Sequence, residues 1–144
     1  TIRDIVAAVR LPVIANGDID SAAKARAVLA HTGAAAVMVG RAAQGRPWLC
    51  GQIDAELATG AAQPEPPRAL LEQLMLGHLE TLHAFYGEAV GTRIARKHVG
   101  WYLAERAGAR DFLREFYRLD TAAAQLTALG GYFAQAAGHE ARAA

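Results

Sequence analysis

Two short apolar segments separated by helical ones limit what the first 60 residues can fold into. Residues 12–16 form a short apolar strand that ends in Asn16, and residues 35–40 are apolar at consecutive positions, which is typical of a parallel strand covered on both faces. Apolar spacing and helix-stop signals predict helices over 1–10, 21–31 and 47–58. This α-β-α-β-α order predicts a parallel β/α sheet. Two strands cannot close a barrel, so we expect the chain alone to self-associate through its exposed barrel edges.

A proline-containing segment, residues 61–67, divides the chain into 1–60 and 68–144. Everything after it is expected to be helical, over 68–86, 90–106 and 110–117 and from Asp120, a plausible N-cap, onward. The first of these helices has one apolar stripe, formed by Leu71, Leu74, Met75, Leu79 and Leu82. The last has a second, formed by Leu126, Leu129 and Phe133.

Composition sets wide limits on location and partners. With 53% apolar and 20% charged residues, the chain is expected to build a core, and a net charge of +1 excludes no class of partner. Its single cysteine, Cys50, rules out an internal disulfide and favours a reducing compartment, the cytoplasm. No apolar run is long enough for a membrane helix, and no signal peptide is visible. Because the chain starts within an expected helix, we infer that it begins inside a larger protein.

Both predicted strands end in a polar corner that contains glycine, Asn16-Gly17-Asp18 and Gly40-Arg41. Parallel β/α folds bind ligands beyond the carboxyl ends of their strands, and the last two strands of a TIM barrel commonly form a phosphate site. Glycine lets the backbone approach a ligand, and arginine can grip a phosphate. The residues therefore support a phosphate site at Gly17, Gly40 and Arg41. The alternative is that the glycines only make tight turns and Arg41 is solvated.

Residues 88–118 carry seven basic and four acidic side chains. Arg93, Arg96 and Lys97 share one helix face, and a second row is formed by Arg110, Arg114 and Arg118. Such rows can follow a phosphate backbone. Taken by themselves, they fit an ordinary solvated face better, with Glu105 or Glu115 pairing nearby. We expect Trp101 and Tyr102 to pack in the core. His78 and His83 are read as boundary residues, and no metal site is predicted.

Three motifs carry a family resemblance. They are LPVIANGDI at 11–19, VMVGRAAQGRPW at 37–48 and RIARKHVGWYL at 93–103. Together they resemble the bacterial tRNA-dihydrouridine synthases, most closely the B-type branch. The resemblance implies the last two β/α units of an FMN-binding TIM barrel, followed by a four-helix C-terminal domain that binds tRNA.

The resemblance also implies an activity. Such enzymes use NADPH to reduce FMN, and the reduced flavin gives a hydride to a uracil base in tRNA while a cysteine protonates the other carbon. The positions that match the FMN-binding segments are Asn16, Gly17, Asp18, Gly40 and Arg41, and those that match the tRNA-binding helix are Arg93, Arg96 and Lys97. The row from Arg110 to Arg118 stays undecided.

The catalytic cysteine of the family has no match here. Cys50 lies after the last strand, in a different motif, and is read as a small buried residue. The chain alone is therefore expected to hold no catalytic residue and to be inactive. Two other functions stay open: a non-catalytic RNA-binding helical module, and a different phosphate-binding β/α barrel enzyme. The latter gives no reason for the Arg-Lys-His motif.

Overall fold

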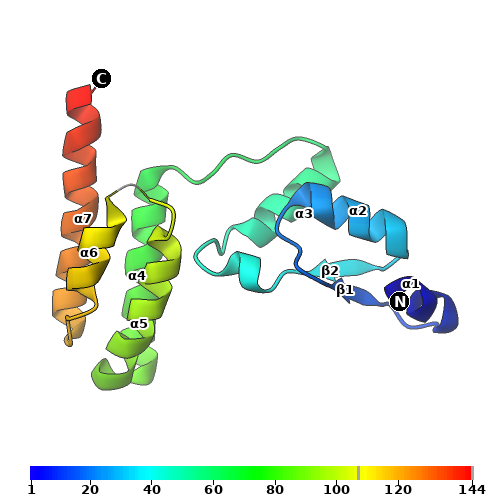
Figure 1. Cartoon of the computed structure of the whole chain (residues 1–144), viewed down its shortest axis with the longest axis horizontal. Coiled ribbons are helices and arrows are strands. Elements are labelled where there is room, and N and C mark those ends of the chain that lie inside the picture. The colour runs from blue at the N-terminus through cyan, green and yellow to red at the C-terminus, as the bar shows by residue number, and fades with distance from the viewer. Residues whose placement is uncertain (107, 144) are drawn as a thin grey trace. The chain divides into compact units, whose positions relative to one another are not determined.

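The chain divides into two compact units, Thr1–Glu65 and Pro66–Ala144 (Figure 1). The computed structural model describes residues 1–106 and 108–143, with side chains given no further than residue 136. The division between the units falls inside the proline-containing segment 61–67. Each unit is described by itself below.

The first unit alternates helices with two parallel strands. Its elements are α1 (Ile2–Ala8), β1 (Ile14–Asn16), α2 (Ala22–Thr32), β2 (Ala36–Met38), the 3₁₀ turn η1 (Arg41–Ala43) and α3 (Leu49–Thr59). The order is the one predicted from the sequence. The strands pair in parallel, with Ile14 opposite Ala36 and Asn16 opposite Met38. Their carboxyl ends therefore lie at the same edge of the sheet.

Local signals explain where the helices begin and end. The Ser21 hydroxyl accepts a hydrogen bond from the Lys24 N–H at the start of α2. Gly33 ends the helix with a φ of 70°, a left-handed conformation that glycine adopts without strain. The predicted third helix is present, but it begins at Leu49 and not at Pro47.

Only one face of the sheet is covered, which corrects the prediction of burial on both faces. Ala15 is fully buried, and Val37 packs against the core that α2 and α3 form. Ile14 and Met38 are 56% and 50% exposed. Alternate residues of a strand point to opposite faces, and among the described residues of this unit no helix packs on the second face.

Cys50 is exposed, so the prediction that it is buried was wrong. Leu49 and Ile53 form the buried stripe of α3. A helix buries positions four residues apart on one side, and Cys50 lies outside that stripe.

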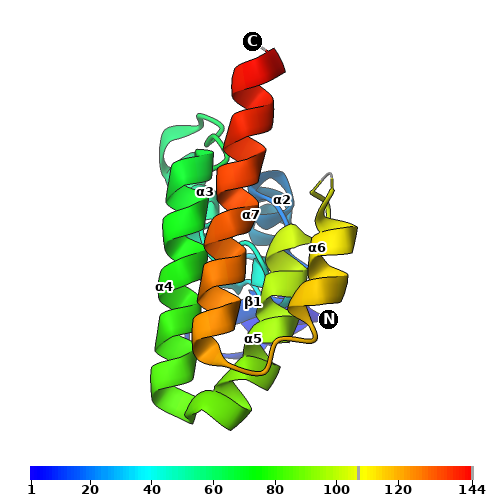
Figure 2. The same cartoon turned by 90° about the vertical axis from the view of Figure 1, so that its left-hand side faces the viewer.

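The described part of the second unit contains α4 (Arg68–Tyr86), α5 (Glu88–Leu103), α6 (Ala109–Phe116) and α7 (Ala122–Ala143). α4 packs against α5 and α7, while α6 packs against α5 and α7 (Figure 2). The predicted stripe of α4 is buried at Leu71, Met75, Leu79 and Leu82, but Leu74 is 37% exposed. Leu129 and Phe133 of α7 are buried as predicted.

The start of α7 differs from the prediction. Its cap is Thr121 and not Asp120, because the Thr121 hydroxyl accepts a hydrogen bond from the Ala124 N–H. The Glu88 carboxylate, at the start of α5, accepts a second hydrogen bond from the Ala122 N–H at 3.0 Å. The two helix starts are thereby tied together.

A buried polar network lies behind this junction. His83 is only 9% exposed, so it lies in the core and not at its boundary. Its Nε2 lies 3.0 Å from Gln125 Oε1. The Gln125 amide donates in turn to the Thr92 and Leu119 carbonyls, which leaves its oxygen free to accept from His83. In the described part of the chain, no helix is long and apolar enough to cross a membrane.

Candidate functional site

The two polar strand ends meet in one hollow. Asn16, Gly17 and Asp18 follow β1, and Gly40 and Arg41 follow β2. Because the strands are parallel, these segments border the same hollow, of about 700 Å³. This volume is within the usual range for small-molecule sites. Its other lining residues are Ile19, Asp20 and Ala42.

An ion pair joins the two strand ends. Arg41 Nη2 lies 2.5 Å from Asp18 Oδ1, and both side chains are largely exposed, at 82% and 70%. An exposed pair contributes little to stability. Asp18 has a φ of 46°, and aspartate is among the few residues that adopt this left-handed conformation readily. The pair therefore places a guanidinium at the mouth of the hollow.

The donor chemistry of the hollow suits an anion. Among the described residues, the remaining N–H groups of Arg41 have no partner, and a guanidinium can bind phosphate with two of them. A Cβ added at Gly17 or Gly40 would meet no atom within 4 Å. Packing therefore does not require these glycines. An anion bound by Arg41 would have to share that side chain with Asp18.

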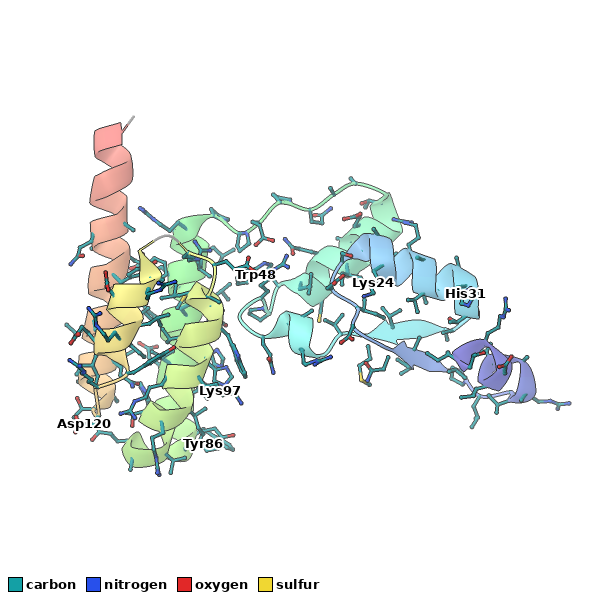
Figure 3. All side chains as sticks on the ribbon, viewed as in Figure 1. Lys24, His31, Trp48, Tyr86, Lys97 and Asp120 are labelled. Atoms are coloured by element: carbon teal, nitrogen blue, oxygen red, sulfur yellow. The ribbon has the colours of Figure 1, made fainter. Side chains whose placement is uncertain are left out.

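The loop after η1 is fastened to the connecting segment. Glu65 accepts hydrogen bonds from Arg46 Nη2 at 2.8 Å and from Trp48 Nε1 at 3.0 Å. The Trp48 side chain is labelled in Figure 3. The Gln52 amide donates to the Pro64 carbonyl at 2.8 Å. We call Arg46, Trp48 and Glu65 the linker clasp. The sequence does not reveal the clasp, because no local pattern pairs Glu65 with residues 17 and 19 positions earlier.

The three basic residues predicted to bind RNA have different surroundings. Arg93 is exposed and donates to the Ala89 carbonyl of its own helix. Lys97 is exposed and lies 4.7 Å from the centre of the Trp101 ring. Arg96 is half-buried and donates to the Leu119 carbonyl at 2.9 Å, while its Nε is buried and has no hydrogen-bond partner among the described residues. Arg96 thus holds the α6–α7 connection.

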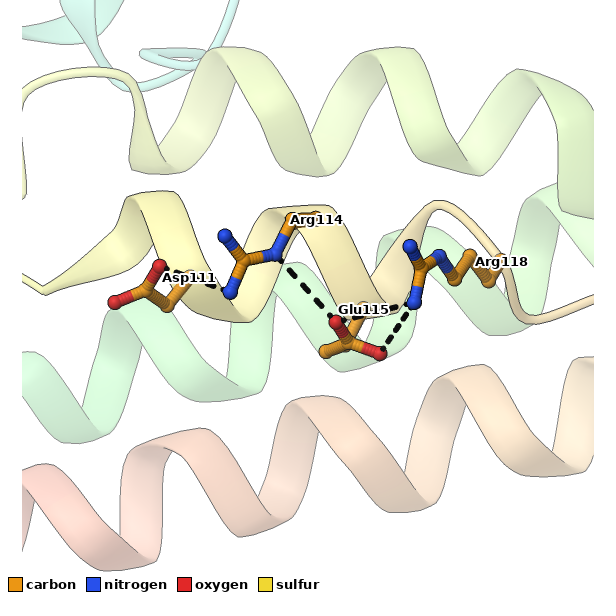
Figure 4. A network of polar contacts seen from close by, with 4 residues as sticks. All are labelled: Asp111, Arg114, Glu115 and Arg118. Carbon is orange, nitrogen blue, oxygen red and sulfur yellow. Dashed lines mark hydrogen bonds and ion pairs between the residues drawn. The ribbon is translucent and has the colours of Figure 1, made fainter.

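Two arginines of the second basic row, Arg114 and Arg118, are paired with acids of α6 (Figure 4). Arg114 lies 3.2 Å from Asp111 and 3.6 Å from Glu115, and Arg118 lies 3.3 Å from Glu115. The alternative reading, that Glu115 pairs with this row, is borne out. Two positive and two negative charges cancel in this cluster.

A cluster of rings lies between α4 and α5. The rings of His78 and His98 are 4.7 Å apart between centroids, and His98 lies edge-on to Trp101 at 5.1 Å. His78 Nδ1 is 3.2 Å from the Tyr102 hydroxyl. Tyr102 is buried as predicted, whereas Trp101 is only half-buried. The sequence could not pair His78 with His98, because the register between two helices is set by packing.

Burial perturbs the titration of this cluster. It lowers the pKa of His78 below the usual value for histidine. It also lowers the pKa of His98, and the charges of His78 and Lys97 add to that effect. Burial raises the pKa of the Tyr102 hydroxyl. Both imidazoles are therefore neutral over a wider pH range than free histidine.

Comparison with known proteins agrees with these features. The model of the family "Dihydrouridine synthase (Dus)" matches residues 1–137. A tRNA-dihydrouridine synthase B of Vibrio vulnificus is 54% identical over 133 residues, which are 92% of this chain and 41% of that protein. Proteins of the same name are 55% identical in Vibrio cholerae, over the same shares, and 52% identical in Pseudomonas aeruginosa, over 94% of this chain and 41% of the relative. The chain thus spans about 41% of the length of these relatives, and it belongs to the dihydrouridine synthase family.

Proposed function

We propose that this chain supplies the flavin-phosphate corner and an RNA-binding face of a tRNA-dihydrouridine synthase. The whole enzyme would reduce uridine in tRNA to 5,6-dihydrouridine, with FMN as cofactor and NADPH as reductant. The observation that carries the proposal is the hollow, in which Asn16, Gly17, Asp18, Gly40 and Arg41 come together from two strand ends. The names of the relatives support the reaction.

In this proposal the first unit forms the last two β/α units of a TIM barrel. The exposed face of its sheet, with Ile14 and Met38, supports this placement, because the interior of a TIM barrel is filled with strand side chains. The second unit would be a four-helix tRNA-binding domain.

The residues of the hollow would bind and orient the cofactor. Arg41 would hold the phosphate, and Gly17 and Gly40 would let the backbone approach it. Bound FMN would supply the hydride chemistry, and the protein its position and surroundings. No residue of this chain is assigned to catalysis, including the exposed Cys50.

The RNA-binding face is proposed at Arg93 and Lys97, whose side chains are exposed. Arg96 was predicted as a third contact. Because its Nη2 is bonded to the Leu119 carbonyl, we propose that Arg96 supports this face by positioning α5 against the α6–α7 connection.

The reaction is tested on a protein that contains this chain together with the remaining length found in its relatives. We expect it to purify with bound flavin and to reduce uridine in tRNA when NADPH is supplied. A colourless protein that binds tRNA but never reduces it would favour the non-catalytic RNA-binding module instead.

The RNA-binding face has its own test. Removing one phosphate contact by Lys97→Ala is expected to lower the slope of log affinity against log salt concentration by about one. Lys24→Ala, at an exposed position of α2, removes the same charge elsewhere and serves as the control, whose slope should stay at the wild-type value. An unchanged slope in Lys97→Ala would remove Lys97 from the interface.

A further inference from the structure

The ring cluster between α4 and α5 has no assigned role in the proposed reaction. His78 comes from α4, and His98 and Trp101 come from α5. The two imidazoles meet edge to face, with an interplanar angle of 67°. Both are half-buried and so remain in contact with solvent. A pair of histidines this close can exchange protons with solvent and can also feel each other's charge.

The surface beside this pair is basic. The Lys97 ammonium lies over the Trp101 ring, against which His98 also packs, and Lys97 extends from α5 (Figure 3). Among the described residues, neither Lys97 nor His98 forms an ion pair with an acid. An anion that docks here would therefore meet an uncompensated positive charge next to two neutral imidazoles.

The groups that face the histidines allow one of them to gain a proton. They are Lys97 and Tyr102, together with the opposite histidine of the pair. The Tyr102 hydroxyl can donate to a neutral His78 Nδ1, and it can accept from a protonated one. Protonation of His78 thus leaves this hydrogen bond in place. Burial opposes the protonation of both histidines. At His98, repulsion from the charges of His78 and Lys97 opposes it further.

A bound phosphate would reverse that balance. Its negative charge offsets Lys97 and favours a positive imidazole beside it. We propose that His78 and His98, beside Lys97, form a proton-gated subsite for an RNA phosphate, so that binding takes up a proton. This inference rests on the proposed RNA-binding function, and it names the regulation of that same face.

Proton linkage fixes the direction in which the RNA affinity changes with pH. If the complex binds more protons than the free protein, affinity rises as pH falls through the titration range of the pair. A phosphate that raises the pKa of one histidine by about one unit would strengthen binding about tenfold across that range. The phosphodiester and the arginine and lysine side chains keep their charge throughout, so they give no such dependence.

The test measures the affinity of the full chain for an unmodified tRNA transcript between about pH 5 and pH 8 at fixed salt. We expect wild type to bind about tenfold more tightly at the acidic end. His78→Gln/His98→Gln, which removes both titrating groups, should bind with a flat pH profile, at the weaker level. His78→Gln/His98→Lys, which carries a fixed positive charge at position 98, should also be flat, at the tighter level. Calorimetry in buffers of different ionisation enthalpy should show proton uptake by wild type and by neither double variant.

His31→Gln, at an exposed histidine of α2, is the matched control and should keep the wild-type profile. Circular dichroism of each variant shows whether the helices are intact. If a folded His78→Gln/His98→Gln keeps the wild-type pH dependence, the inference fails while the RNA-binding function stands. If wild type binds no tRNA even at low salt and acidic pH, both fail together.

Discussion

At the scale of the residue, the two arginines of α5 differ in the role proposed for them. Arg96 would have a structural role, whereas Arg93 would contact RNA. We expect Arg96→Ala to lower the free energy of unfolding by about 1–2 kcal/mol, because the Leu119 carbonyl loses a charged donor. Arg93→Ala removes only an exposed contact within α5 and should change stability by less than about 0.5 kcal/mol. Urea denaturation followed by circular dichroism measures both. Equal effects in the two variants would contradict the assignment of Arg96.

At the scale of the element, one glycine sets the distance between α4 and α5. A Cβ at Gly91 would lie 2.9 Å from His83 Cα and 2.9 Å from the Leu82 carbonyl oxygen, atoms that belong to the backbone. We expect Gly91→Ala to destabilise the protein by about 1–3 kcal/mol. Gly77→Ala on α4 meets no atom within 4 Å and should stabilise it by about 1 kcal/mol. If Gly91→Ala left the stability of the protein unchanged, α4 and α5 would be able to move apart freely.

The elements also show what the sequence can and cannot predict. The helix over 68–86 was predicted to its last residue, because its apolar stripe and its end before Gly87 are local signals. The order of elements and the two strand-end motifs are equally local. The one-sided burial of the sheet, the Arg41–Asp18 pair and the His78–His98 contact depend on packing between distant segments. No periodicity reports such contacts.

The linker clasp gives a prediction for the connection between the units. Glu65→Ala removes the acceptor of Arg46 and Trp48, which costs about 1–2 kcal/mol of local stability. Limited proteolysis within 61–66 should then be about tenfold faster, since cleavage follows the population of the open segment. In the control variant Glu80→Ala, on α4, the segment should be cleaved at the wild-type rate. Unchanged cleavage in Glu65→Ala would show that the clasp does not hold the segment.

At the scale of the whole molecule, the uncovered face of the sheet predicts association. Ile14 and Met38 expose apolar side chains, which favours self-association of the chain when it is made alone. In sedimentation experiments we expect wild type to form dimers or larger species and Ile14→Lys/Met38→Lys to shift toward monomer. The control Val90→Lys, at an exposed apolar position of α5, should not shift the protein toward monomer. A monomeric wild type would contradict the prediction.

The most direct test of the central claim compares two flavins that differ by the phosphate. In a protein that contains this chain and the rest of its relatives' length, we expect Arg41→Ala to weaken FMN binding about 10- to 100-fold, the effect of losing a charged hydrogen bond. Binding of riboflavin, which lacks the phosphate, should be unchanged. Arg10→Ala, at an exposed arginine of the same unit, should affect neither flavin. Flavin fluorescence titration measures all of these affinities. An Arg41→Ala variant that keeps its FMN affinity, or loses both flavins equally, would contradict the assignment of the hollow as the phosphate site.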